Sequence, residues 1–182
     1  MFGLLSLFEN LLNWIFAFCF MLPYRCSLIA DPDGPGWSFA QGVYDFLHER
    51  MDDVELNRVR FRRFRDGEVK PKIESNVRSR TCFFVHDSNI PPSAWTTELL
   101  LVNQALRIAQ AHEVVDVLPY LMFSRQDRKD ESRVSISAKA LTKIIEPYAH
   151  QVLTLDVHNP AIQGFYDIPF DNLYSFPTFV EY

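Results

Sequence analysis

The chain has 182 residues, 48% of them hydrophobic, so it is long enough to bury one sizeable core, and one domain is the default expectation. Its net charge of -5 excludes a chain that binds nucleic acid through an overall basic surface. The three cysteines, Cys19, Cys26 and Cys82, are odd in number and lack CxxC spacing. This pattern argues against a disulfide framework or a zinc site and favours a reducing, cytoplasmic setting.

Residues 1–22 form an apolar segment of nearly membrane-spanning length, set apart from the domain that we expect over 23–182. Glu9, Asn10 and Asn13 interrupt this segment, and polar groups are costly inside a bilayer. It also lacks the basic start and the small-residue cleavage site of a secretory signal. Three interpretations stay open: a membrane anchor, an amphipathic helix that packs on a partner, or translated sequence upstream of a start at Met21.

Hydrophobic patterns predict alternating strands and helices along the rest of the chain. A short apolar run at 25–30 ends in a Pro- and Gly-rich loop. Strands are expected at 56–64, 69–73, 81–85, 114–118 and 152–157. Helices are expected at 39–51, 94–111 and 136–149. Strands that alternate with helices form βαβ units, so the sequence predicts an α/β domain with a mostly parallel sheet and helices on both faces.

Three polar clusters follow predicted buried strands. They cover residues 86–89, 120–130 and 156–160. In open α/β sheets, ligands bind at the carboxyl ends of the strands. Position and residue type therefore agree in predicting a functional site at this edge of the sheet.

The segment 124–137, SRQDRKDESRVSIS, concentrates charge after one of these strands. Arg125 and Gln126 are suited to grip a polyphosphate, because a guanidinium group and an amide donate fork-like hydrogen bonds to phosphate oxygens. A solvated charged loop is the alternative, and most charged runs are of that kind.

The second segment, LDVHNPAIQGFYDIPFDNLY, supplies candidate metal ligands. Asp156 and His158 are two residues apart, so on a strand they share a face. Aspartate oxygens suit magnesium, whereas imidazole suits a transition metal better or contacts phosphate or metal-bound water. Asp167 and Asp171 flank Pro169, which argues against a helix, so they are expected on a loop that could return towards His158. Capping and turn formation are the alternative roles of these side chains.

The runs SRQDRKDESRVSISAK and VLTLDVHNPAIQGFYDIPFDNLYSFP closely resemble the ribose-phosphate pyrophosphokinases, also called phosphoribosyl pyrophosphate synthetases. RFRDGEVKPKIESNVRSRTCFFVHDSN and TELLLVNQAL resemble an earlier stretch of the same family. The resemblance implies a phosphoribosyltransferase-like, Rossmann-like fold. It also implies transfer of the β,γ-diphosphoryl group of ATP to the 1-hydroxyl of ribose 5-phosphate, with Mg²⁺, giving AMP and phosphoribosyl pyrophosphate.

The resemblance further implies roles for individual residues. It assigns Phe64, Asp66, Gly67 and Glu68 to the segment that reaches an ATP site from a neighbouring subunit. It assigns Arg125, Gln126 and Asp130 to contacts with ATP. It assigns Asp156, His158, Asp167 and Asp171 to the metal-nucleotide site.

The resemblance covers only the first of the two similar domains of this family. The catalytic lysine and arginine segment and the loop that holds ribose 5-phosphate are implied to lie in the second, so no catalytic residue is expected in this chain. We therefore expect the ATP-side half of a ribose-phosphate diphosphokinase, inactive without the C-terminal domain and part of a homo- or hetero-oligomer. The alternatives are a non-catalytic module that regulates or oligomerises with a full-length enzyme and, third, a membrane-tethered nucleotide binder.

Overall fold

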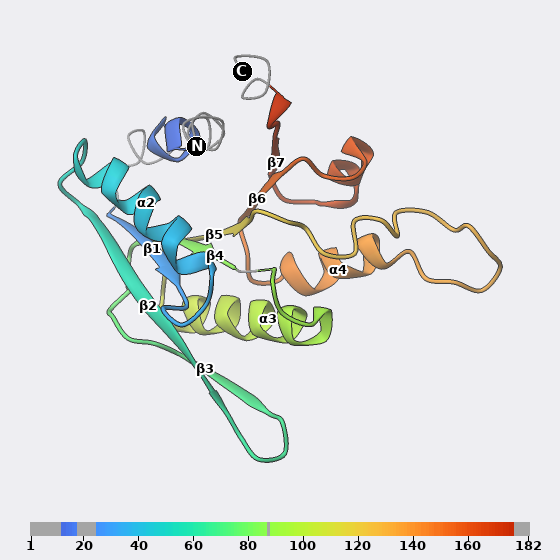
Figure 1. The fold of residues 1–182 in the computed structure, drawn as a ribbon, viewed down its shortest axis with the longest axis horizontal. Coiled ribbons are helices and arrows are strands. Elements are labelled where there is room, and N and C mark those ends of the chain that lie inside the picture. Colours follow the sequence, from blue (N-terminus) through green and yellow to red (C-terminus); the bar gives the residue numbers. More distant parts are fainter. Residues whose placement is uncertain (1–11, 18–24, 87, 177–182) are drawn as a thin grey trace.

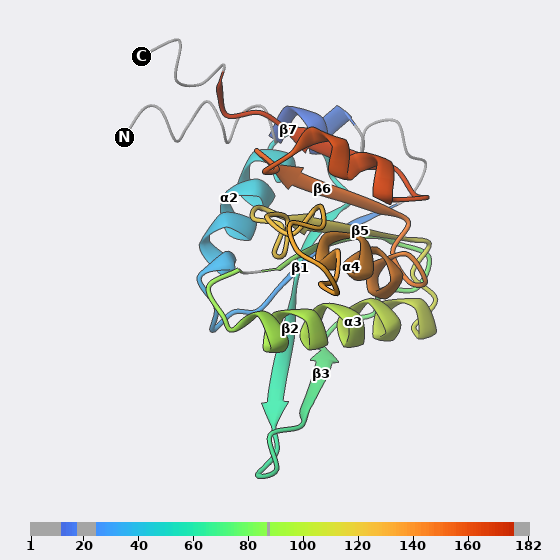
Figure 2. The ribbon, with the colours of Figure 1, turned by 90° about the vertical axis from the view of Figure 1, so that its right-hand side faces the viewer.

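A computed structural model describes residues 12–17, 25–86 and 88–176 of the chain. In this part of the protein, seven strands form one sheet of order β3-β2-β1-β4-β5-β6-β7, and helices cover both of its faces (Figure 1, Figure 2). The strands are β1 (Cys26–Ala30), β2 (Val54–Arg63), β3 (Val69–Ile73), β4 (Thr81–Val85), β5 (Glu113–Leu118), β6 (Gln151–Leu155) and β7 (Phe170–Leu173). The helices are α2 (Gly36–His48), α3 (Pro92–Ile108), α4 (Ser137–Ile145) and the 3-10 helix η1 (Pro160–Phe165).

The pairing of the strands confirms the predicted fold class. Only β2 and β3 pair antiparallel among the described strands, and every other neighbouring pair is parallel. The helix predicted over 136–149 ends at Ile145, because Pro147 has no amide hydrogen to continue the helical hydrogen bonds. The helix predicted from 94 begins earlier, at Pro92, since proline suits the first helical turn.

Strand β7 was not predicted. Its four residues follow Pro169 and pair in parallel with β6, at the edge of the sheet. All four are only half-buried, so they lack the alternation of buried and exposed residues that reveals a strand. Asp171 therefore lies in a strand and not in the expected loop.

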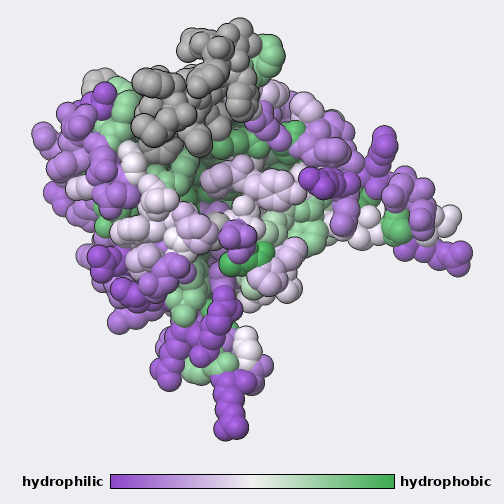
Figure 3. Space-filling view, viewed as in Figure 1, coloured by the Kyte–Doolittle hydropathy of each residue, from purple (hydrophilic) through white to green (hydrophobic). Residues whose placement is uncertain are grey.

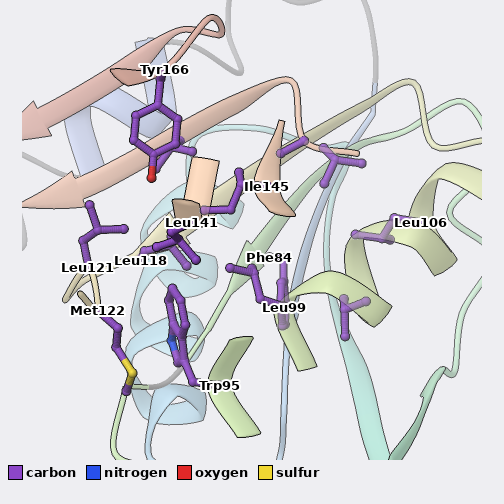
Figure 4. Close-up of a cluster of buried hydrophobic side chains, with 14 of the residues drawn as sticks. Phe84, Trp95, Leu99, Leu106, Leu118, Leu121, Met122, Leu141, Ile145 and Tyr166 are labelled. Carbon is purple, nitrogen blue, oxygen red and sulfur yellow. The ribbon is translucent and has the colours of Figure 1, made fainter. Parts of the chain in front are cut away.

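Two hydrophobic layers hold the sheet between its helices. Under α3 and α4, Trp95, Leu99 and Ile145 are fully buried against Phe84 and Leu118 of the sheet. Figure 4 shows these side chains converging between the two helices and the strands. The opposite layer lies under α2, where Ala40, Val43 and Leu47 pack on β1 and its neighbours. The sheet is covered on both faces, as the apolar strands predicted.

The apolar N-terminal segment contributes to this second layer. Residues 12–17 are helical, and Leu12 and Ile15 are buried within the cluster under α2. This packing against the chain's own sheet was not among the three interpretations of residues 1–22, most of which lie outside the described residues. Among the residues that the structure describes, no helix is long and apolar enough to cross a membrane.

A buried carboxyl group sits in the centre of the sheet. Asp116 of β5 has no exposed surface, and Asn103 of α3 donates a hydrogen bond of 2.8 Å to its Oδ2 atom. Within the described chain its Oδ1 atom has no hydrogen-bond partner. Burial raises the pKa of the Asp116 carboxyl to about 7, although the Asn103 hydrogen bond lowers it. The folded protein therefore binds a proton here at mildly acidic pH.

This carboxyl predicts a pH dependence of stability. Because its pKa is raised on folding, its contribution to the free energy of unfolding is complete below the unfolded-state pKa and is lost as the pH rises through about 7. The slope is at most about 1.4 kcal/mol per pH unit. In Asp116→Asn this part of the pH dependence disappears, which urea unfolding at mildly acidic and mildly alkaline pH would measure. Parallel stability curves for the two proteins would contradict the prediction.

Candidate functional site

A polar cavity of about 770 Å³ opens at the carboxyl ends of β5 and β6. Two segments form it: the long loop from β5 to α4 and the turn from β6 to η1. The lining residues are Arg125, Gln126, Asp127, Arg128, Asp130, Val134, Ser135, His158 and Asn159. Two of the three predicted polar clusters therefore meet in one site.

The base of the β5–α4 loop is fixed by main-chain hydrogen bonds. The Gln126 amide donates to the Phe123 carbonyl at 3.0 Å, and the Gln126 carbonyl accepts from the Ala138 amide in the first turn of α4 at 3.1 Å. Ser124 is buried beside them, whereas the side chains of Arg125 and Gln126 are exposed. The backbone at the start of the loop is thus held while these two side chains face the cavity.

The arginines of the loop are available to an anion. Within the described residues, neither Arg125 nor Arg128 forms an ion pair, whereas Arg60, Arg63 and Arg80 each pair with a carboxylate. Asp127 and Asp130 partly offset the positive charge of the cavity. Exposed guanidinium groups without a protein partner favour a ligand that carries several negative charges.

The end of β7 positions the turn that carries His158. The Asp156 amide donates to the Leu173 carbonyl at 2.9 Å, and the Val157 amide donates to the Asn172 Oδ1 atom at 2.8 Å. The Asp156 carboxylate accepts from the Ser175 amide, at 3.1 Å to Oδ1 and 3.3 Å to Oδ2. Asp156 adopts a left-handed φ of 43°, which turns the chain out of β6 and leaves His158 exposed at the cavity.

Phe64, Asp66, Gly67 and Glu68 lie together at the tip of the β2–β3 hairpin. Figure 1 and Figure 2 show that this hairpin projects beyond the sheet, away from the β5–α4 loop. The projecting hairpin and the projecting β5–α4 loop are both mainly hydrophilic on the face shown in Figure 3. Arg63, the last residue of β2 before the turn, pairs with the buried Glu98 of α3 at 2.5 Å. These four residues therefore point away from the cavity of their own chain.

A sequence profile of the N-terminal domain of ribose phosphate pyrophosphokinase matches residues 38–148, which is more than half of the chain. The chain belongs to the ribose-phosphate pyrophosphokinase family. It is 39% identical to a ribose-phosphate pyrophosphokinase of Bradyrhizobium diazoefficiens over 156 residues, covering 85% of this chain and 47% of the relative. It is 43% identical to one of Rhizobium meliloti over 139 residues, covering 76% and 43%.

Solved structures agree with this family. Phosphoribosylpyrophosphate synthetase from Mycobacterium smegmatis is similar at a TM-score of 0.74 and 27% identity, over 87% of this chain and 51% of that one. Hypoxanthine-guanine phosphoribosyl transferase of L. donovani shares the fold at a TM-score of 0.53 and 12% identity, over 93% of this chain and 79% of that one. The expected phosphoribosyltransferase-like fold is confirmed. The chain spans about half the length of the curated relatives it matches.

Some of the residues that the family resemblance assigns to the ATP and metal sites line the cavity together. Arg125, Gln126, Asp130 and His158 all line it. Asp156 lies at the foot of the same turn, but its carboxylate is engaged by the Ser175 amide. The four expected metal ligands do not form one cluster: no group of three or more potential ligand side chains occurs in residues 12–17, 25–86 and 88–176.

Asp167 and Asp171 lie near the amino ends of the strands, on the side of the sheet opposite the cavity. The Asp171 carboxylate accepts a hydrogen bond from Gln151, at the start of β6, at 2.5 Å. Asp167 lies beside Lys143 and Glu146, near the end of α4. A crossover helix runs back along the sheet, so its end lies near the amino ends of the strands. The expected return of these two carboxylates towards His158 is not observed, because β7 and its parallel pairing hold them away.

The third polar cluster, residues 86–89, does not line this cavity, and His86 joins the core. His86 is 3% exposed and stacks between Phe84 and Trp95, with its Nε2 atom 2.9 Å from the Trp95 carbonyl oxygen. Asp87 lies outside the described residues. The sequence could not reveal this burial, because a histidine after an apolar strand suits a site and a core equally well.

Asn159, for which the sequence predicted no role, lies in the wall of the cavity. A signal was present: an asparagine before a proline is typical of a helix N-cap. The Asn159 Oδ1 atom accepts from the Ala161 amide at the start of η1. Its contact across the cavity, to Asp127, required the tertiary structure.

The hairpin tip predicts a local effect of Gly67→Ala. Gly67 has a φ of 93°, where a side chain costs about 1 kcal/mol or more. The variant is expected to speed amide exchange at Phe64, whose amide donates to Glu68 across the turn at 2.8 Å, while the core stays protected. Gly164→Ala is the matched control, because Gly164 has open space and no positive φ. Equal exchange at Phe64 in both variants would refute strain at the tip.

Proposed function

We propose that this chain forms the ATP-side half of a ribose-phosphate diphosphokinase, which transfers the β,γ-diphosphoryl group of ATP to ribose 5-phosphate. The observation that carries the proposal is the cavity at the carboxyl ends of β5 and β6, where Arg125, Gln126 and His158 meet. It lies where α/β folds bind ligands, and its free guanidinium groups suit a polyphosphate. Family membership and the names of the relatives support the same reaction.

In this proposal each residue acts on the donor nucleotide. Arg125 and Arg128 bind phosphate oxygens and Gln126 orients them by hydrogen bonds, so the guanidinium groups offset the charge of the transferred group. Phosphoryl-type transfer depends mainly on such positioning and electrostatic stabilisation, not on a protein nucleophile. The chain needs no catalytic nucleophile to serve as the donor half.

Mg²⁺ fits the donor set of the cavity. This ion usually keeps several waters and binds one or two protein groups together with substrate phosphates. His158 and Asp130 both line the cavity and would hold the ion or its waters beside the phosphates. The proposal assigns structural contacts to Asp156, Asp167 and Asp171. Two of these carboxylates accept hydrogen bonds within the chain, and that of Asp167 lies beside Lys143. The bound ion supplies positive charge that neutralises the phosphate oxygens.

Two further parts would complete the site. The hairpin tip with Phe64, Asp66 and Glu68 reaches the cavity of a neighbouring subunit, which makes the assembly an oligomer. The acceptor, ribose 5-phosphate, is bound by a second domain, since the relatives are about twice as long as the matched part. Without both parts, ATP meets only a fraction of its contacts.

The first prediction from this proposal concerns ATP binding. The chain alone is expected to bind Mg-ATP weakly, in the millimolar range, measured by calorimetry. Arg125→Ala is expected to weaken binding about tenfold, because it removes charge-assisted phosphate contacts. The control is Arg25→Ala, which removes an exposed arginine before β1, at the opposite edge of the sheet. Equal affinities of the two variants would remove Arg125 from the phosphate site, and micromolar binding to a monomer would contradict a half-site.

The second prediction concerns the reaction. With ATP, ribose 5-phosphate and Mg²⁺, the chain alone is expected to release no AMP, and adding the C-terminal half of a family member is expected to restore AMP release. The Arg125→Ala variant in the same mixture controls for activity of the added half. No AMP release in any mixture, together with co-purification with a full-length relative, would favour the non-catalytic module over the donor half.

A further inference from the structure

We propose that Asn159 is a positioning residue: its hydrogen bond to Asp127 holds the arginine-bearing β5–α4 loop against the turn that carries His158. The inference rests on the proposed function, since it assigns a role within the same cavity. The Asn159 Nδ2 atom donates to the Asp127 Oδ2 atom at 2.5 Å. Both side chains are half-buried, so water competes less with this charge-assisted bond than it would at the surface.

One side of this bridge is fixed to the body of the domain. The Asn159 Oδ1 atom accepts from the Ala161 amide at 3.0 Å and so caps η1, which begins at Pro160. The preceding turn is held to β7 through Asn172. Asn159 therefore uses its two amide atoms for different tasks, because Oδ1 anchors its own backbone and Nδ2 reaches the loop.

The other side of the bridge is the wall segment with few hydrogen bonds to the domain. After Gln126, whose carbonyl binds the Ala138 amide, residues 128–134 form no hydrogen bond or ion pair with the rest of the described chain. The Asp127 bond is thus the last attachment of the loop before Ser135, which contacts Ser137. Figure 1 shows the loop beyond this point as an open arc.

The consequence is preorganisation of the phosphate site. Arg125 and Arg128 flank Asp127 in the loop, and His158 directly precedes Asn159. The bridge therefore adds to the main-chain bonds at Gln126 and fixes the arginine-bearing wall of the cavity relative to the wall that carries His158. When these groups are ordered before the ligand arrives, binding does not have to offset the entropy of ordering the loop.

A pair of exchange variants tests the bridge without any ligand. Asn159→Asp keeps the cap of η1 but removes the Nδ2 donor and places two carboxylates face to face. Asp127→Asn keeps an acceptor for Asn159, and the double variant Asp127→Asn/Asn159→Asp restores the bond with donor and acceptor exchanged and the net charge unchanged. Hydrogen exchange at the Gln126 and Ala138 amides, which donate the main-chain bonds next to Asp127, is expected to accelerate several-fold in Asn159→Asp and to return to the wild-type rate in the double variant. Unchanged exchange in Asn159→Asp, or no rescue in the double variant, would overturn the bridge.

Mg-ATP affinity then tests the positioning role. Calorimetry is expected to show about tenfold weaker binding to Asn159→Asp and near wild-type binding to the double variant, with similar unfolding temperatures for all four proteins. Rescue of exchange without rescue of affinity would refute positioning, because the bridge would then be only structural. If the wild-type chain binds no Mg-ATP, the proposed function fails, and the exchange measurements still decide whether the bridge orders the loop.

Discussion

The parallel pairing of β5 with β6 is the constraint on which the candidate site depends. Val117 pairs with Leu153 and Leu118 with Thr154, so both strands end at the same edge of the sheet. The segments that follow them, one rich in arginine and one with His158, are then forced to leave the sheet side by side. Buried apolar residues on both faces maintain this register, because a shift would expose them to water. The same residues would form no cavity if the strands ran antiparallel.

The two edges of the sheet carry different kinds of polar contact. At the carboxyl edge, guanidinium and imidazole groups remain exposed and available to a ligand. At the amino edge, the Asp171 carboxylate accepts a hydrogen bond from Gln151, and the Asp167 carboxylate lies beside Lys143. The Asp167 amide donates to the Glu146 carboxylate. A carboxylate that already has a neighbour inside the chain is a weaker candidate for metal binding than one that lines an open cavity. The proposed function therefore divides the residues of the motif between ligand binding and structural contacts.

In the proposed function, the hairpin and the cavity are two separate binding surfaces of the domain. The hairpin is tied to the body through Arg63 and the buried Glu98, so it is held in a defined direction although its tip is exposed. Because the tip projects away from its own cavity, the proposal assigns it to the site of another subunit. Together with the shared length of only about half of each relative, this geometry makes the proposed activity a property of an assembly.

The sequence by itself determined the α/β class, the order of its elements and the family, because periodic burial and the long RQDRKD and DVH segments are local signals. It also placed Arg125, Gln126, Asp130 and His158 after strands that end at one edge. Only the tertiary structure decided which carboxylates reach the cavity, since β7 has no periodic signal and yet carries Asp171 to Gln151. The contact between Asp127 and Asn159 and the burial of Asp116 likewise depend on packing between elements far apart in the chain, which no local pattern encodes.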